Sequence, residues 1–312
     1  MIKVILDTSS WQDPNSMPYA DPEFQSNVSM VIAKMSMGGG YDPHCDGHLT
    51  LAKQNGYRIG GYAWLDPTQD WIKQAFYAVN KINLHKMDVW SPDVEQYWAS
   101  WPKYWDYVNG KIPNSEVPRI TSSKWVDCFC TIMETVLANT DVPKDNVMVY
   151  WADWVARIYP ALIPFAGEYR QWIADYTKAR SWIIRNHSSN FYVTWEVFQL
   201  LAEYLVTQAP ILPNGLTQYT LWQIDSKLIV PEAGQRLDFS IFPWDYWDDW
   251  LGDEPEPDPD PYPEDLVLQV AANHAAIGLC QDDIQEVTTT IGNLVSRLDP
   301  LETWAENISY KG

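Results

Sequence analysis

The chain alternates short apolar segments with segments of helical spacing. Short continuous apolar runs suit strands that are buried on both faces. The expected strands cover residues 2–6, 28–34, 57–64, 86–95, 147–151, 171–176, 219–224 and 236–242, and the expected helices cover 49–55, 68–83 and 121–139. Alternating strands and helices form a mainly parallel sheet, and this many strands close most naturally into a barrel. We therefore predict an α/β fold with a (β/α) barrel of the TIM type, incomplete in its last helices because less helix separates the late strands.

The expected strand at residues 86–95 ends in two carboxylates, Asp93 and Glu95. Residues i and i+2 of a strand point to the same face, so these side chains should project side by side. Two neighbouring carboxylates repel when both are ionised, which drives one to keep its proton near neutral pH. The pair then supplies an acid and a base, as cleavage of a glycosidic bond requires. The alternative is a solvated acidic loop after a strand, since Asp-x-Glu is a common pattern.

A third carboxylate, Asp7, directly follows the first apolar run. In a barrel, a carboxylate at the C-terminal end of a strand faces the active site. The alternative is that Asp7 merely caps or turns the chain.

The composition excludes some classes of partner. With 41 acidic and 21 basic residues the net charge is -20, which opposes binding to nucleic acid and to anionic membrane surfaces. The 18 Trp and 18 Tyr fit a sugar site as well as a core, because their flat apolar faces pack on sugar rings. The first apolar run is too short for a signal peptide or a transmembrane segment, so neither is expected.

The four cysteines, Cys45, Cys128, Cys130 and Cys280, predict neither a disulfide framework nor a zinc site. Cys128 and Cys130 are too close for an ordinary disulfide, and no second pair accompanies them. Residues 42–48 include His and Asp side chains that resemble metal ligands, but no partner cluster appears elsewhere in the sequence. We therefore expect no metal and no cofactor.

The C-terminal part of the sequence differs from the rest. Residues 244–265 are rich in Trp, Asp, Glu and Pro and contain neither Lys nor Arg, which predicts a stiff, extended acidic linker. Residues 266–312 follow a heptad pattern, with Val270, Ile277, Ile284, Ile291 and Leu298 at the a positions. This pattern favours a helix that forms a dimeric or trimeric coiled coil. The alternative is an amphipathic helix that docks on the preceding domain.

Seven short motifs occur in order along residues 1 to about 243. They are DTSSWQ (7–12), VIAK with YDP (31–34 and 41–43), residues 52–62, PDVE (92–95), WIADY (172–176), WQ (222–223) and LDFSIF (237–242). Each motif is weak alone, but in this order they resemble glycoside hydrolase family 25, the Chalaropsis-type lysozymes.

The resemblance implies a barrel that hydrolyses the β-1,4 bond between N-acetylmuramic acid and N-acetylglucosamine in peptidoglycan. Carried over by position, Glu95 would be the general acid that protonates the leaving oxygen. Asp93 would be its charged neighbour, which stabilises positive charge at the sugar or orients its N-acetyl group. Asp7 and Asp238 match the family's other active-site carboxylates. Residues near the sugar would be Tyr62, Trp64, Trp172, Tyr176, Trp222 and Gln223.

Two departures from the family pattern bear on activity. Ser240 stands where the family usually has Asn, and residues 98–118 form an insertion that enlarges a loop. Neither change removes a catalytic carboxylate, so we expect an active enzyme, with an inactive relative as the alternative.

These features favour a muramidase that acts on the bacterial cell wall, with a glycan strand as its substrate. A coiled coil in place of a wall-binding module suggests attachment to a larger structure such as a bacteriophage tail. We therefore predict a phage-borne enzyme, either a tail-associated lysin or an endolysin released from the host cell. Its protein partner would be itself, through the coiled coil, or a virion tail protein. One alternative is a non-catalytic wall-binding or virion structural protein, and another is a glycosidase acting on a different N-acetylated polysaccharide.

Overall fold

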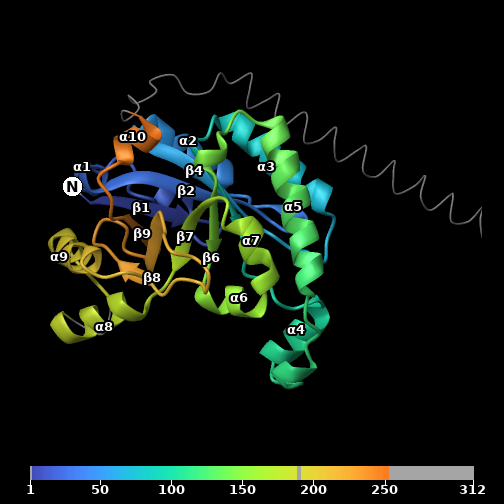
Figure 1. Cartoon of the computed structure of the whole chain (residues 1–312). Helices are drawn as coiled ribbons and strands as arrows, with labels where there is room; N and C mark the ends of the chain where they lie inside the picture. The colour runs from blue at the N-terminus through green and yellow to red at the C-terminus, as the bar shows by residue number, and fades with distance from the viewer. Residues whose placement is uncertain (1, 188–190, 253–312) are drawn as a thin grey trace, which may run out of the picture. The chain divides into compact units, whose positions relative to one another are not determined.

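Eight strands form a closed barrel in the computed structural model, which describes residues 2–187 and 191–252 (Figure 1). The barrel strands are β1 (Lys3–Thr8), β2 (Val28–Met37), β4 (Arg58–Trp64), β5 (Val89–Asp93), β6 (Met148–Trp151), β7 (Arg170–Ala174), β8 (Leu221–Ile229) and β9 (Arg236–Phe242). Pairing of β1 with both β2 and β9 closes the ring, while the short β3 (Gly40–Tyr41) pairs with β2 outside it. The predicted barrel is confirmed.

The barrel strands are parallel except at β9, which runs antiparallel to both β8 and β1. Residues 230–235 join β8 to β9, and this connection is too short for the crossover that a parallel pair requires. The helix that would complete the barrel is therefore missing between these two strands. The prediction of less helix among the late strands holds only here, because two helices lie between β7 and β8, namely α8 (Thr177–Asn186) and α9 (Trp195–Val206).

The three predicted helices are present as α2 (Cys45–Gln54), α3 (Trp71–His85) and α5 (Ser122–Asn139). Side-chain caps fix where two of them begin. The Asp70 carboxylate accepts from the Lys73 amide at the start of α3, and the Thr121 hydroxyl accepts from the Lys124 amide at the start of α5. In α9, the buried residues Trp195, Phe198, Leu201, Ala202 and Leu205 follow helical spacing, so this helix packs its apolar face inward.

Two apolar cores lie on opposite faces of the barrel wall. The larger core packs between the strands and the surrounding helices. The smaller core fills the inside of the barrel and comprises Ile5, Met30, Ile32, Val89, Met148, Tyr150, Trp172, Leu221, Phe242 and Trp247. Because side chains alternate along a strand, the residues two positions after Ile5 and Ile32 also face inward, and these are Asp7 and Lys34.

The loops at the C-terminal ends of the parallel strands carry short helices. Residues 98–118, which we call the α4 arm, follow β5 and include α4 (Trp101–Val108). The helices α6 (Asp153–Ile158) and α7 (Ile163–Ala166) follow β6. In Figure 1 the arm stands out from the barrel at the same end as α6 and α8. The short helices α1 (Pro22–Asn27) and α10 (Trp247–Leu251) complete the described fold.

The barrel unit continues past residue 243, where the sequence predicted an acidic linker to begin. Trp247 in α10 is buried and packs edge-to-face on Phe242, with ring centroids 5.2 Å apart. Residues 244–252 therefore belong to the barrel unit, because their aromatic side chains pack against its interior core. The rest of the predicted linker and the predicted coiled coil at 266–312 lie outside the described residues. None of the described helices is both long and apolar enough to cross a membrane.

Candidate active site

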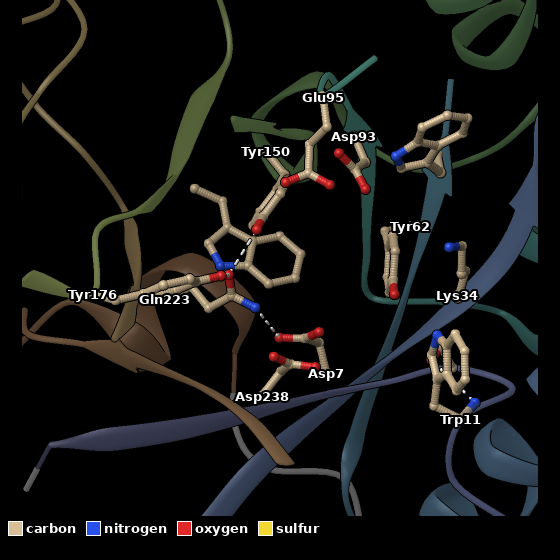
Figure 2. A pocket seen from close by; sticks show the side chains of 13 residues that line it. Asp7, Trp11, Lys34, Tyr62, Asp93, Glu95, Tyr150, Tyr176, Gln223 and Asp238 are labelled. Atoms are coloured by element: carbon tan, nitrogen blue, oxygen red, sulfur yellow. Dashed lines mark hydrogen bonds between the residues drawn. The ribbon is translucent and has the colours of Figure 1, made fainter. Parts of the chain in front are cut away.

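A cavity of about 260 Å³ opens at the C-terminal end of the parallel strands. It is lined by Asp7, Ser9, Trp11, Lys34, Tyr62, Trp64, Asp93, Glu95, Tyr150, Trp172, Tyr176, Gln223 and Asp238. Figure 2 shows Asp93 and Glu95 together on one side of this cavity, and Asp7 with Asp238 on the opposite side. The barrel therefore brings together four carboxylates that are far apart in the sequence.

Strand geometry accounts for the position of each carboxylate. Asp7 lies near the end of β1 and stands directly opposite Asp238 in the antiparallel ladder with β9. Asp93 is the last residue of β5. The i, i+2 spacing predicted that Asp93 and Glu95 share one face of a strand. Glu95 instead lies just beyond the end of β5. Both nevertheless line the same cavity.

Gln223 on β8 connects three of the polar side chains in the site. Its Nε2 donates to Asp7 Oδ2 at 3.0 Å, and its Oε1 accepts from the hydroxyls of Tyr150 at 2.7 Å and Tyr176 at 2.6 Å. The amide thus uses both ends at once, which fixes its orientation. This network holds Asp7 and the two tyrosines in fixed relative positions.

Several aromatic rings line the cavity. Trp172 meets Tyr62 and Tyr150 edge-to-face, with ring centroids 6.3 and 4.9 Å apart. Its Nε1 donates to Ser240 Oγ at 2.9 Å. The hydroxyl of Ser240 thus orients the indole at the position where the family motif usually has Asn.

Burial raises the pKa values of two cavity carboxylates, Asp7 and Asp93. Burial raises the pKa of Asp7 well above its usual value, and the Asp238 charge raises it further. Burial likewise raises the pKa of Asp93 well above its usual value, with the Glu95 charge acting in the same direction. The Lys34 ammonium opposes both shifts. The four carboxylates therefore do not all ionise together at neutral pH.

The remaining two carboxylates have smaller upward shifts. Burial raises the pKa of Glu95, while Lys34 and hydrogen bonding with Trp64 and Tyr150 lower it. Burial, with the charges of Asp225 and Glu95, raises the pKa of Asp238 to about 7. The site can therefore hold both protonated and ionised carboxyl groups near neutral pH, as general acid and base chemistry requires.

One predicted contact residue, Trp222, does not line the cavity. Its side chain is fully buried in the outer core, and its Nε1 donates to the Asp175 carbonyl at 2.7 Å. Neighbouring strand residues point to opposite faces, so only one of Trp222 and Gln223 can face the barrel interior. The other nine predicted site residues all line the cavity.

Sequence reasoning missed four lining residues, Ser9, Trp11, Lys34 and Tyr150. Lys34 had a signal, because a lysine in an apolar strand two residues after Ile32 should share its inward face. Tyr150 likewise stands two residues after Met148 on β6. Trp11 lies in a loop, which gives no periodic signal, and its side chain is 87% exposed at the cavity.

A buried carboxylate, Asp66, supports the loop that carries Glu95. Its Oδ1 accepts from Gln96 Nε2 at 2.8 Å, and its Oδ2 accepts from Trp101 Nε1 at 2.8 Å. It also accepts from Thr68 and Gln69. Because Gln96 directly follows Glu95, these bonds restrict the backbone on which the carboxyl group of Glu95 is carried.

The His and Asp side chains of residues 42–48 support the loop at the other side of the site. His48 Nε2 lies 3.0 Å from the Gln12 carbonyl, and His44 Nδ1 lies 2.8 Å from the same carbonyl. Asp46 instead pairs with Lys81 at 2.7 Å. Across residues 2–187 and 191–252, no group of three or more His, Cys, Asp or Glu side chains is arranged to hold a metal ion.

Several solved structures share this fold over most of both chains. A family 25 glycosyl hydrolase from Bacillus anthracis aligns at 14% identity and a TM-score of 0.55, covering 80% of this chain and 93% of that one. The catalytic domain of the endolysin ply40 from bacteriophage P40 of Listeria monocytogenes aligns at 17% identity and a TM-score of 0.53, covering 81% and 98%. A bacterial lysozyme from Streptomyces coelicolor aligns at 16% identity and a TM-score of 0.52, covering 77% and 91%. These likenesses show the fold.

The family itself follows from the sequence. No curated protein sequence matches the chain. The model of glycosyl hydrolases family 25, however, matches residues 6–233, which is well over half of the chain. This match contains Asp7, Asp93 and Glu95 and ends shortly before Asp238. The chain therefore belongs to glycosyl hydrolase family 25.

Proposed function

We propose that the protein is a muramidase, which cleaves the β-1,4 bond between N-acetylmuramic acid and N-acetylglucosamine in peptidoglycan. The observation that carries this proposal is the arrangement of two carboxylate pairs, Asp93 with Glu95 and Asp7 with Asp238, around one cavity. Burial raises the pKa of Glu95, which favours retention of the proton that a general acid donates. Family membership supports the same reaction class.

In the proposed mechanism, Glu95 donates its proton to the glycosidic oxygen as the bond breaks. Asp93 stabilises the positive charge that develops on the sugar, or accepts a hydrogen bond from its N-acetyl group. Asp93 Oδ1 suits this role, because it is buried and has no hydrogen-bond partner among the described residues. A substrate N–H would satisfy that oxygen and so favour binding.

Asp7 and Asp238 have a second role in this mechanism. The pair retains one proton and so carries a single negative charge, on the side of the cavity opposite Glu95. The exposed indole of Trp11 and the rings of Tyr62, Trp172 and Tyr176 would pack against the sugar. Gln223 would keep Asp7 in position through the bond from its Nε2.

We further propose that the enzyme is phage-borne, as a tail-associated lysin or an endolysin, and self-associates through residues 266–312. The heptad pattern of the tail supports self-association as a dimer or trimer. Attachment to a virion tail protein through the same segment is the alternative partner.

The first test compares wild type with Glu95→Gln for release of reducing sugars from purified peptidoglycan. Glutamine keeps the shape of the side chain and removes the proton, so we expect activity to fall at least about a hundredfold. Glu203→Gln, an exposed substitution on α9, is the matched control and should retain full activity.

Mass spectrometry of the products identifies the bond that is cut. New reducing ends on N-acetylmuramic acid are expected of a muramidase, whereas ends on N-acetylglucosamine would assign a different glycosidase. If wild type binds cell walls but releases no sugar, the proposal fails in favour of the non-catalytic wall-binding alternative.

A further inference from the structure

The helix α4 is rich in aromatic side chains, of which Trp105 is exposed and the others are half-buried. None of its residues is buried, although Trp101, Tyr104, Trp105, Tyr107 and Val108 make up most of it. The side chain of Trp105 is 52% exposed and that of Val108 is 49% exposed. Trp105 and Val108 are three positions apart, so their exposed side chains lie on the same face of the helix.

The aromatic rings of the α4 arm connect to the wall of the candidate active site. Trp64 lines the cavity, and its ring centroid lies 5.8 Å from that of Trp101. Trp101 stacks in turn on Trp105, with centroids 6.4 Å and ring planes 28° apart. A row of three indoles therefore leads from the cavity wall to an exposed ring.

The exposed rings are held in place by packing and hydrogen bonds. Trp98 and Tyr104 stack with centroids 3.8 Å and planes 10° apart, at the base of the arm. The bond from Trp101 Nε1 to the buried carboxylate of Asp66 fixes the indole on which Trp105 stacks. A surface ordered before binding loses less entropy when a ligand arrives, which favours affinity.

We propose that the α4 arm binds the glycan strand outside the cavity, with Trp105 as a stacking platform for a sugar of the strand being cut. This inference rests on the proposed function and extends its binding site. The cavity of about 260 Å³ is small beside a polymer, so a bound strand must continue over neighbouring surface. The arm adjoins the cavity and presents flat apolar faces that suit the C–H faces of sugar rings.

Charge on the arm is compatible with this ligand. Peptidoglycan strands carry carboxylates, which the protein's overall charge of -20 repels. The α4 helix itself carries Lys103 and Asp106, and Lys111 pairs with Asp106 at 3.2 Å. The arm is thus not an acidic surface, and it offers the strand a contact without strong repulsion.

The test uses the full-length protein and two substrates of different length. One is a peptidoglycan tetrasaccharide, and the other is long glycan strands freed of stem peptides. For Trp105→Ala we expect kcat/KM on long strands to fall about three- to tenfold, mainly through KM, with no change on the tetrasaccharide. Trp105→Phe keeps an aromatic face and should restore most of the loss. Leu200→Ala, an exposed apolar change on α9 outside the arm, is the matched control.

Several outcomes would overturn the proposal. One is equal kcat/KM on long strands for wild type and Trp105→Ala. Another is an equal fall in kcat/KM on both substrates, which would indicate a disturbed cavity. If instead Trp105→Ala abolishes concentration-dependent dimerisation without altering the length dependence, the arm contacts a second copy of the chain. If wild type cleaves neither substrate, the proposed function fails. In that case calorimetry tests separately whether the arm binds glycan. Wild type should bind long strands more tightly than the tetrasaccharide, and Trp105→Ala should remove this difference.

Discussion

Asp7 and Asp238 face each other across the β1–β9 ladder at a position where like charges destabilise a sheet. Burial adds to the cost, because both carboxyl groups lose water on folding. Lys34 opposes the shift of Asp7, and Gln223 donates a hydrogen bond to it. A pair of acids that opposes folding at neutral pH is understandable at a functional site, where local cost is tolerated for chemistry.

The raised pKa of Asp238 predicts how its replacement changes stability with pH. Unfolded, this carboxyl group loses its proton near 3.8, whereas in the fold its pKa is about 7. Between these values the folded state binds more protons, so this group's contribution to stability falls as pH rises through the window. We expect Asp238→Asn to be about 1–3 kcal/mol more stable than wild type at pH 8, after allowing for partial solvent screening.

Urea denaturation of both proteins at pH 4, 6 and 8 measures this difference. It should be much smaller at pH 4, close to the unfolded pKa of 3.8, because most of the pH dependence lies between that value and about 7. Taking the difference removes contributions from other titrating groups such as His48, which both proteins share. Asp245→Asn, an exposed substitution, should show no such pH dependence. A difference that stays constant from pH 4 to 8 would refute the argument.

The position of a side chain was predictable where strand periodicity or a motif determines its direction. Asp7, Asp93, Glu95 and Asp238 all reach one cavity. Trp222 was predicted to lie near the sugar, but it does not line the cavity. The motif contains two adjacent residues, and only the strand register decides which of them faces inward. Trp11 was missed because a loop imposes no period on its side chains.

At the scale of helices, strands and loops, Asp66 connects three segments through hydrogen bonds. It follows β4, and its carboxylate accepts from Gln96 in the loop after β5 and from Trp101 in the α4 arm. Trp125 of α5 also donates to the Gln96 carbonyl at 2.9 Å. The segment carrying Glu95 is therefore held from several sides, so its position depends on contacts between elements.

Replacing Asp66 with Asn should loosen this arrangement. Both carboxylate oxygens of Asp66 accept hydrogen bonds. In asparagine, an NH₂ group replaces one of these oxygens, so its N–H donors would face the donors that this oxygen now binds. We expect a loss of about 2–4 kcal/mol in the free energy of unfolding. We also expect a fall of about tenfold or more in kcat as Glu95 shifts, with a smaller change in KM.

Thermal or urea unfolding and steady-state kinetics on the same preparations test both effects. Asp70→Asn is the matched control, because this exposed residue caps α3 and asparagine caps a helix as well as aspartate. If Asp66→Asn retains wild-type kcat, Asp66 does not position Glu95.

The elements were predictable to different degrees. All eight barrel strands were predicted from short segments that are mainly apolar, as expected of strands buried on both faces. The antiparallel direction of β9 was not assigned, although the short connection at 230–235 determines it. The helices α8 and α9 were not predicted, although the apolar residues of α9 follow helical spacing and Thr194 caps its start.

At the scale of the whole molecule, the barrel and the C-terminal segment were predictable on different grounds. The barrel follows from many strands that must each bury two faces, so the sequence constrains it strongly. The predicted linker began too early, because the apolar role of Trp247 depends on contacts with Phe242 across the fold. For residues 266–312 the prediction depends on the heptad period, and a solution measurement of assembly is its direct test.

If residues 266–312 form a coiled coil, a charge in its seam should dissociate the assembly. Ile284 occupies an a position, and a buried aspartate there would lose apolar packing and place like charges from neighbouring helices together. We expect light scattering to give two or three times the monomer mass for wild type and the monomer mass for Ile284→Asp. Gln285→Asp adds the same charge outside the seam and should leave the assembly intact. Dissociation should also weaken retention on cell walls, because several linked barrels bind a polymer more tightly than one. A monomeric wild type, or equal effects of the two substitutions, would show that the heptad pattern does not drive self-association.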